Sequence, residues 1–312
     1  MGVAEEAVWD IFRNPSPRRK GVGAPGDDCA LLQPPPGRGL LQTCDQVIEG
    51  VHLLPSDPPK VYAQKLLRRC LSDLAAAGAT PWAAQWTMAI PPERGRAWML
   101  RLAKAFRAEA EAFGLPVAGG DVSQAPVVVL TCTLLGLANG KVPGRGKLRG
   151  NETLFVSGNL GGAVSSGRHR CPEPRLGLGQ HLVEHYAPRA MMDLSDGVAR
   201  DLPRLLGRTP EQKASQVAAW GAEIQLTELP LSQGLEANPE GWASAIGEGE
   251  DYELLVALAP RQARAVSEDH LLQKHGLRAI GKVVRQSGIR FLDLTGRSRR
   301  LKAKGWEYGW RQ

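Results

Sequence analysis

The stretch MMDLSDGVARDL, from Met191 to Leu202, places Asp193 and Asp196 around Ser195, directly after a short apolar run. The apolar run predicts a strand that ends at Asp193, so Ser195 and Asp196 lie in the turn that follows. Aspartate and serine are common turn residues, and the stretch holds no histidine for a Ser-His-Asp triad. The rest of the sequence must therefore decide whether these carboxylates form a turn or hold a ligand.

Outward from this stretch, strand-like and helix-like segments alternate along the chain. We expect strands at 40–45, 83–90, 127–138, 153–158, 252–259 and 277–284, and helices at 59–79, 96–113 and after Pro260. The glycine- and lysine-rich segment 139–152 is typical of a linker. The sequence therefore predicts an α/β or α+β fold in two domains, 1–145 and 146–312.

Composition limits the classes of function. The chain has 312 residues, a formal net charge of +7 and an isoelectric point near 9.3, which favours an anionic partner. Its basic clusters are short and lack interleaved aromatic residues, so we expect no nucleic-acid partner. The longest apolar run, VVVLTCTLLGLA from Val127, is too short to span a bilayer, so we expect no membrane partner.

Cysteine usage predicts the compartment. The five cysteines are scattered and form no CxxC pair, which argues against both a disulfide framework and a thiolate zinc site. The start of the chain carries Glu5 and Glu6 in place of a basic, apolar leader. We therefore expect a soluble protein of the reducing cytoplasm.

Aspartates recur at the predicted strand ends and in one predicted helix. The set comprises Asp27, Asp28, Asp45, Asp73, Asp121, Asp193 and Asp196. Any single member is more commonly a turn former or a helix cap. Several carboxylates without partner histidines favour Mg²⁺ shared with phosphate groups over a zinc centre.

Two motif matches would indicate a dinucleotide-binding protein and a zinc protease, but the surrounding sequence argues against both. GVGAPG at 21–26 matches GxGxxG, but no strand precedes it, and an acidic turn and an apolar strand follow it in place of a helix. HLVEH at 181–185 matches an inverted zinc-protease pattern, although an amphipathic surface turn explains five residues as well. No Walker A sequence occurs.

Six motifs together carry a resemblance to a known family. They are GDDCALL, TCDQVIEGVHL, CLSDLAAAGATP, GGD, MMDLSDGVARDL and GEDYELL, in this order along nearly the whole chain. The sequence resembles the thiamine-monophosphate kinases, which belong with aminoimidazole ribonucleotide synthetase, selenophosphate synthetase and a hydrogenase maturation protein. The resemblance implies an N-terminal α/β domain that dimerises and binds ATP and magnesium, and a C-terminal α/β sandwich.

The resemblance also assigns roles to individual positions. It implies magnesium at Asp28, Thr43, Cys44, Asp45, Asp73, Asp121, Asp193 and Asp196. It implies ATP contacts at Gly120, Asp121, Arg145 and Ser195, and thiamine phosphate contacts at His52, Glu250 and Trp306. Two of these have ordinary structural alternatives, since His52 also suits a half-buried histidine and Trp306 a C-terminal core anchor. No side-chain nucleophile is expected.

The sequence departs from the family pattern at several positions. Cys44 replaces a threonine, and a neutral thiol is a poor ligand for magnesium. Glu248 interrupts a pair of glycines to give GEGED, and Arg145 is only a near match to the expected arginine. The segment between Gly162 and the sequence CPEPR is short, as if a helix were deleted.

The resemblance implies an activity and an assembly. We expect ATP-dependent phosphorylation of thiamine monophosphate to thiamine diphosphate by direct in-line transfer, several Mg²⁺ ions, and a homodimer. Two alternatives stay open on the sequence. One is another ATP-using enzyme of the same superfamily, of the aminoimidazole ribonucleotide synthetase type, and the other is a non-catalytic nucleotide-binding protein.

Overall fold

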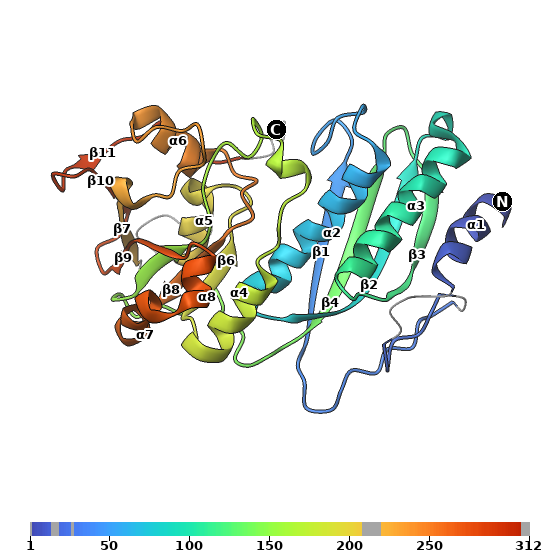
Figure 1. Cartoon of the computed structure of the whole chain (residues 1–312), viewed down its shortest axis with the longest axis horizontal. Coiled ribbons are helices and arrows are strands. Elements are labelled where there is room, and N and C mark those ends of the chain that lie inside the picture. The colour runs from blue at the N-terminus through green and yellow to red at the C-terminus, as the bar shows by residue number, and fades with distance from the viewer. Residues whose placement is uncertain (1, 14–18, 26–27, 208–219, 307–312) are drawn as a thin grey trace. The chain divides into compact units, whose positions relative to one another are not determined.

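The computed structural model describes residues 2–13, 19–25, 28–207 and 220–306, which form two units (Figure 1). The first unit contains Met1–Leu74, Ala79–Asn139 and Arg170–Glu173, and the second contains Ala75–Gly78, Gly140–His169 and Pro174–Gln312. The main division lies between Asn139 and Gly140, inside the predicted linker.

The first unit is built on a four-stranded sheet. Its strand order is β1-β4-β2-β3, with β1 at Leu40–Ile48, β4 at Val129–Leu137, β2 at Thr80–Ile90 and β3 at Val117–Gln124. Strand β4 pairs antiparallel with both β1 and β2, whereas β3 pairs parallel with β2. The helices of this unit are α1 at Gly2–Phe12, α2 at Pro59–Ala76, η1 at Pro92–Arg94 and α3 at Gly95–Ala112.

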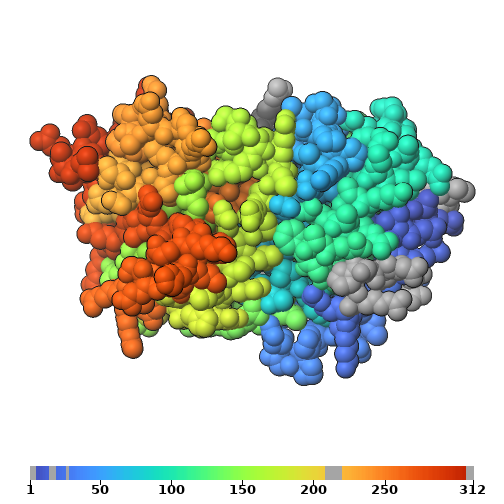
Figure 2. All heavy atoms as spheres, in the orientation of Figure 1, coloured from blue at the N-terminus to red at the C-terminus, as the bar shows by residue number. Residues whose placement is uncertain are grey.

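Helices cover one face of this sheet. The α2 and α3 ribbons lie side by side across it in Figure 1, and their atoms form a continuous surface in Figure 2. Phe106 of α3 stacks on Trp86 of β2 with ring centroids 4.1 Å apart, and the thiol of Cys70 in α2 lies 3.3 Å from the carbonyl oxygen of Cys132 in β4. The apolar core of the unit therefore lies between α2, α3 and this face.

The opposite face of the sheet carries polar side chains. Gln42, Cys44 and Gln46 alternate on β1 with the half-buried residues that face α2, and all three are exposed. Near one end of the sheet, Val22, Leu32 and Leu135 pack against a buried cluster of Trp82, Ala83 and Leu137. Val22 and Leu32 form only an isolated bridge, so the predicted apolar strand after GVGAPG is wrong.

The second unit is built on a seven-stranded sheet of order β11-β10-β7-β9-β5-β8-β6. The strands are β5 at Thr153–Val156, β6 at Ala190–Asp193, β7 at Gly221–Gln225, β8 at Leu254–Leu258, β9 at Arg278–Val284, β10 at Ile289–Leu292 and β11 at Ser298–Arg299. The α-helices are α4 at Leu176–His181, α5 at Val198–Leu205, α6 at Pro239–Gly247, α7 at Pro260–Ala265 and α8 at His270–Lys274. Shorter helical turns lie at Arg168–Arg170, Leu182–Tyr186, Leu226–Glu228 and Val266–Glu268.

Apolar clusters lie on both faces of this second sheet. Met192 of β6 packs in the cluster that holds residues of α5 and α6. The neighbouring Met191 packs in the cluster that holds residues of α4 and α8. Because successive strand residues point to opposite faces, helices on both sides bury the sheet, and β8 is buried along its whole length.

The predicted strands at 40–45, 83–90, 127–138, 153–158, 252–259 and 277–284 are confirmed, as are both long helices and the helix after Pro260. The predicted strand end at Asp193 is confirmed, whereas Asp45 and Asp121 lie within β1 and β3. Mixed α/β structure in two sheets agrees with the predicted fold class. Within the described residues, no helix is long and apolar enough to cross a membrane.

Candidate functional site

In the first unit, β1 presents Thr43 and Asp45 toward α2. Both lie on the half-buried face of the strand, two residues apart, whereas Cys44 between them is exposed on the other face. The Thr43 hydroxyl donates a short hydrogen bond to Asp73 near the end of α2. The structure therefore brings Thr43, Asp45 and Asp73 to one side of the sheet, but not the thiol of Cys44.

A cation that the sequence analysis did not identify joins this group. Arg69 lies one helical turn before Asp73, and its guanidinium is 3.4 Å from the Asp45 carboxylate and 2.9 Å from the carbonyl oxygen of Gln46. Cys70 follows Arg69 on α2, and its pKa is raised by burial, by its contact with Cys132 and by the nearby charges of Asp45 and Asp73. The i, i+4 spacing of Arg69 and Asp73 was the available signal, because these positions share a helix face.

The remaining sequence-predicted residues of the first unit lie apart from this group. Asp121 is exposed on β3, beside Thr87 and thus on the open face of the sheet, and β4 and β2 separate its strand from β1. Asp28 is exposed ahead of Leu32, and Asp27 lies outside the described residues.

His52 accepts a hydrogen bond of 3.1 Å at Nδ1 from the Ile48 N–H. A Cβ at Gly120 would meet the Trp86 carbonyl oxygen, so this glycine permits close packing of β3 on β2.

In the second unit, the DLSDG and GEGED segments lie side by side at one end of β6 and β8. The pairing of the two strands continues past them, since Leu194 N–H donates to the Glu253 carbonyl at 2.8 Å and Tyr252 N–H donates to Leu194 at 2.9 Å. Glu250 N–H then donates to the Ser195 carbonyl at 2.8 Å.

The C-terminal segment joins the same two loops. Trp306 N–H donates to the Asp196 carbonyl at 3.0 Å, and 42% of Trp306 is exposed. Asp193 is buried at the end of β6 with 6% exposure. Four sequence-predicted residues, Ser195, Asp196, Glu250 and Trp306, therefore meet in one cluster, directly beyond Asp193. Arg145 is exposed in the loop between β4 and β5.

The backbone of these loops adopts conformations that favour glycine. Gly197 and Gly249 have φ of 89° and 74°, and a Cβ at Gly249 would lie 2.6 Å from the Ser195 carbonyl oxygen. Glu250 and Tyr252 also have positive φ, 61° and 53°, although neither is glycine. Such positions cost on the order of 1–3 kcal/mol each and occur often at ligand sites.

A second arginine that the sequence analysis did not identify contacts Asp196. Arg204 of α5 donates to the Asp196 carboxylate at 2.5 Å and to the Asp201 carboxylate at 2.8 Å. Asp201 also accepts the Asp196 N–H at 2.9 Å, and burial raises the pKa of Asp201 to about 6. Asp201 and Arg204 are three residues apart on one helix, a spacing that predicts contact between them. The spacing does not predict that Arg204 also contacts Asp196.

Glu248, which interrupts the family's glycine pair, binds the loop that follows β5. Its carboxylate accepts the Gly162 N–H at 2.6 Å, and Asp251 accepts the Gly161 N–H at 3.0 Å. Arg168 adds an ion pair of 2.7 Å to Asp251. Two acids that flank Glu250 are thus anchored to consecutive backbone N–H groups, and this anchoring fixes the position of Glu250.

Oxygen donors dominate the group of predicted residues in each unit. No group of three His, Cys, Asp or Glu side chains in the described ranges is arranged to hold a metal ion by itself. Magnesium commonly uses one or two carboxylates, waters and substrate phosphates. In the first unit, Thr43, Asp45 and Asp73 carry oxygen donors of the kind that magnesium uses. In the second unit, Asp193 and Asp196 do so separately.

HLVEH forms a different structure from a zinc helix. Residues Leu182–Tyr186 form a π-helical turn, and His181 is 2.6 Å from Asp269, which also accepts a hydrogen bond from Tyr186. Burial raises the pKa of Asp269, but the hydrogen bonds from His181, Tyr186 and the Leu272 N–H together outweigh burial and lower the pKa to about 2. The motif is therefore used in a structural network between α4 and α8.

Comparisons with known proteins bear on the class of this fold. Residues 26–138 match the family described as AIR synthase related protein, N-terminal domain. The chain is 31% identical to the thiamine-monophosphate kinase of Rhodopirellula baltica over 300 residues, which cover 91% of this chain and 90% of the relative.

Two solved structures have the same fold. The crystal structure of thiamine-monophosphate kinase from Stenotrophomonas maltophilia K279a is 26% identical, covers 94% of this chain and 97% of its own, and has a TM-score of 0.78. A structure described as AaThiL complexed with AMPPCP and TMP is 25% identical, covers 86% and 87%, and has a TM-score of 0.71.

The fold and its two carboxylate-bearing halves define an AIR synthase related protein of two α/β units. Within that class, the chain belongs to the thiamine-monophosphate kinase family. The predicted resemblance and the predicted fold class are confirmed.

The buried Asp251 predicts a dependence of stability on pH. Burial raises the pKa of Asp251 to about 7, against the opposing effects of the Gly161 N–H and Arg168. Because an unfolded aspartate titrates near 3.9, the folded state binds the Asp251 proton more tightly than the unfolded state does. The contribution of this proton to the free energy of unfolding is complete below about pH 4 and is lost as the pH rises through 7. Between pH 5 and pH 8 we expect the free energy of unfolding to fall by roughly 2–3 kcal/mol more in the parent than in Asp251→Asn. Urea denaturation at both pH values measures this difference, and parallel pH profiles would contradict the prediction.

Proposed function

We propose that the protein transfers the γ-phosphoryl group of ATP to thiamine monophosphate and releases thiamine diphosphate and ADP. The observation that carries the proposal is the cluster of Ser195, Asp196, Glu250 and Trp306 in a member of the thiamine-monophosphate kinase family. The related structure that is described as complexed with AMPPCP and TMP supports both substrates.

The electrostatic problem of this reaction explains the residue types. Both substrates are anions, and two unit charges about 4 Å apart repel by roughly 4 kcal/mol at a surface-like dielectric. The acceptor is itself a phosphate oxygen, so no side-chain nucleophile is needed. The protein must align the two substrates in line and offset their charge.

The residues divide between the two substrates. Ser195 and the backbone at Gly120 would hold ATP, with Arg145 offering a cation to its phosphates. Glu250 would contact the thiamine phosphate, with the exposed ring of Trp306 as an aromatic face and His52 as a further polar contact. The anchoring of Asp251 and Glu248 then keeps Glu250 in place while substrates exchange.

Magnesium would supply the positive charge that the acidic motifs lack. Asp45, Asp73 and Thr43 of the first unit, and Asp193 and Asp196 of the second, are the oxygen donors that fit it. Asp28 and Asp121 complete the proposed set, and Cys44 would contribute through its backbone oxygen because its side chain lies on the other face of β1. When bound, the ion neutralises charge that develops on the transferred phosphoryl group.

A direct assay tests the proposed reaction. Purified protein with ATP, magnesium and thiamine monophosphate is expected to form thiamine diphosphate and ADP in equal amounts, resolved by chromatography. Folded protein that binds ATP but forms no thiamine diphosphate would contradict the proposal. ATP hydrolysis that requires a different metabolite would point instead to an enzyme of the aminoimidazole ribonucleotide synthetase type.

The substitution Asp196→Asn separates a metal role from a turn role. Asparagine keeps the size of the side chain and caps a turn nearly as well, but it removes the charge. We expect turnover to fall at least about a hundredfold, roughly 2.7 kcal/mol of transition-state stabilisation, with partial recovery at high magnesium. Steady-state kinetics and a melting curve measure both effects. Near-parental turnover at low magnesium would assign Asp196 to the turn alone.

We also propose a homodimer that forms through the open face of the first sheet. Among the described residues, helices lie on one face of β1, β4, β2 and β3 (Figure 1), and the other face carries half-buried Thr131 and Thr133 on β4. Asp121 and Asp45 lie on the outermost strands, about three interstrand spacings or roughly 14 Å apart. Asp121 lies on this open face and a second copy would cover it, whereas Asp45 faces α2 on the other side of the sheet.

Light scattering tests the dimer. At micromolar concentration we expect twice the chain mass of 33.6 kDa. Thr133→Arg places a charge at the centre of the open face and is expected to give monomers, whereas Ser267→Arg, on the exposed surface of the second unit, leaves the mass unchanged. Parent protein that scatters only as a monomer would exclude this assembly.

We place the protein in the cytoplasm. All five cysteines are free thiols, including the exposed Cys29 and Cys44. Proteins of oxidising compartments commonly pair their cysteines. The substrates proposed here are also intracellular phosphate esters.

A further inference from the structure

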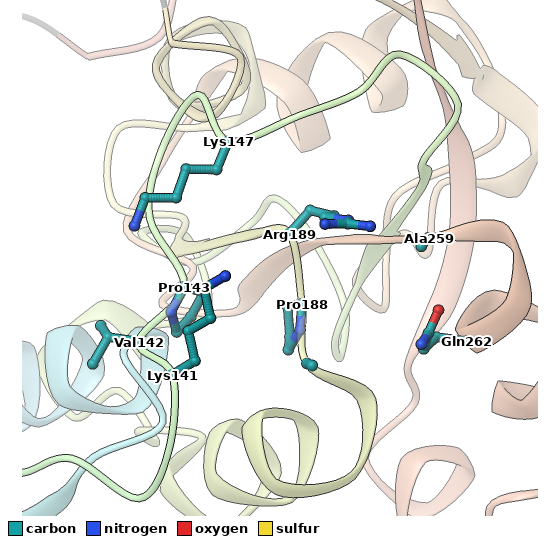
Figure 3. Close-up of a pocket in the computed structure, with 9 residues that line it drawn as sticks. Lys141, Val142, Pro143, Lys147, Pro188, Arg189, Ala259 and Gln262 are labelled. Atoms are coloured by element: carbon teal, nitrogen blue, oxygen red, sulfur yellow. The ribbon is translucent and has the colours of Figure 1, made fainter.

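A pocket of about 220 Å³ lies in the second unit, at the end of β6 and β8 that is remote from the DLSDG and GEGED segments (Figure 3). Ala190, at the start of β6, pairs with Ala257, whereas Asp193 at the other end pairs with Leu254. The pocket is lined by residues just before β6 and just after β8, so the length of both strands, roughly 10 Å, separates it from the proposed catalytic loops.

Positive charge dominates the lining of the pocket. Lys141 and Lys147 come from the loop after β4, and Arg189 precedes β6. No carboxylate lines the pocket, and no ion pair joins these three cations to an acid among the residues that the structure describes. The pocket therefore presents net positive charge that remains available to an anion.

The labelled view shows how these groups are arranged. Pro188 and Arg189 lie between the two lysines on one side and Gln262 of α7 on the other (Figure 3). A cationic guanidinium, two ammonium groups and a carboxamide N–H are all hydrogen-bond donors. Such a donor set matches the oxygens of a phosphate group better than it matches a cation or a neutral amine.

The walls of the pocket are apolar and fixed. Pro143 and Pro188 are buried, and Arg189 N–H donates to the Ala257 carbonyl at 2.9 Å, which ties the wall to the sheet. Ala187, which also lines the pocket, has a φ of 43°. A non-glycine residue in this conformation is strained and occurs often at ligand sites.

The size of the pocket limits the ligand. Pockets for drug-sized ligands measure about 300–1,000 Å³, so 220 Å³ is too small for a nucleotide and suits a phosphate on a compact organic group. We propose that this pocket binds a small phosphorylated metabolite, with the phosphate held by Lys141 and Arg189 and the organic group against Pro143 and Pro188.

Calorimetric titration tests the proposal with two probes, inorganic phosphate and phenyl phosphate. Chelator is present throughout, so that phosphate binding through magnesium at the catalytic loops is suppressed. We expect saturable binding of one phenyl phosphate per chain, tighter than inorganic phosphate because the ring contacts the proline walls. Lys141→Gln and Arg189→Gln are each expected to weaken phenyl phosphate binding about tenfold, the effect of losing one charge-assisted hydrogen bond.

Lys274→Gln is the matched control, because it removes one exposed positive charge on α8 outside the pocket and is expected to leave the affinity unchanged. Lys141 is exposed, so its substitution tests the site even where Arg189→Gln disturbs folding. Absence of saturable binding, equal weakening in all three variants, or an affinity that neither pocket variant changes would overturn the proposal. Equal affinity for the two probes would contradict the proposed contact between the organic group and the proline walls.

Discussion

The antiparallel pairing of β6 and β8 is the interaction on which the candidate site of the second unit depends. The ladder does not stop at Asp193 and Leu254, because Leu194, Tyr252 and Glu253 extend it by two further backbone hydrogen bonds. This extension forces the DLSDG and GEGED loops together, although about fifty residues separate them along the chain. The buried sheet therefore determines where the residues of both loops lie.

That rigidity has a conformational cost, and the neighbouring contacts offset it. Glu250 and Tyr252 both adopt positive φ without being glycine. The carboxylates of Glu248 and Asp251 bind the N–H groups of Gly162 and Gly161, and Glu253 accepts paired hydrogen bonds of 2.8 and 2.6 Å from Arg175. Charge-assisted hydrogen bonds of this kind are stronger than neutral ones. The strained Glu250 and Tyr252 therefore lie next to acidic residues whose carboxylates are held by hydrogen bonds.

Sequence reasoning located the long elements and the acidic motifs because both rest on local patterns. The helices at 59–76 and 95–112 have strong apolar periodicity, and DLSDG follows a short apolar strand. β3, β7, β10 and β11 were not predicted as strands. β7, β10 and β11 have five residues or fewer and gain their stability from sheet neighbours distant in sequence, and the two glycines of β3 interrupt its apolar pattern. Local residue patterns carry little information about such pairings.

The same limit applies to the candidate site. Alternation along β1 is enough to show that Thr43 and Asp45 share a face and that Cys44 does not, yet the sequence was read with all three as ligands on the strength of a family pattern. Arg69 and Arg204 were missed because an arginine near an aspartate in sequence is common, and only the fold shows which carboxylate each one reaches.

These two arginines also explain how clustered carboxylates persist in a folded chain. Like charges raise the free energy of the folded state unless a cation lies near, and Arg69 and Arg204 each provide one next to a proposed magnesium ligand. Arg204 contacts both Asp196 and the fully buried Asp201. If a divalent cation draws Asp196 away, Arg204 still has Asp201 as a partner, so the exchange leaves no buried charge uncompensated.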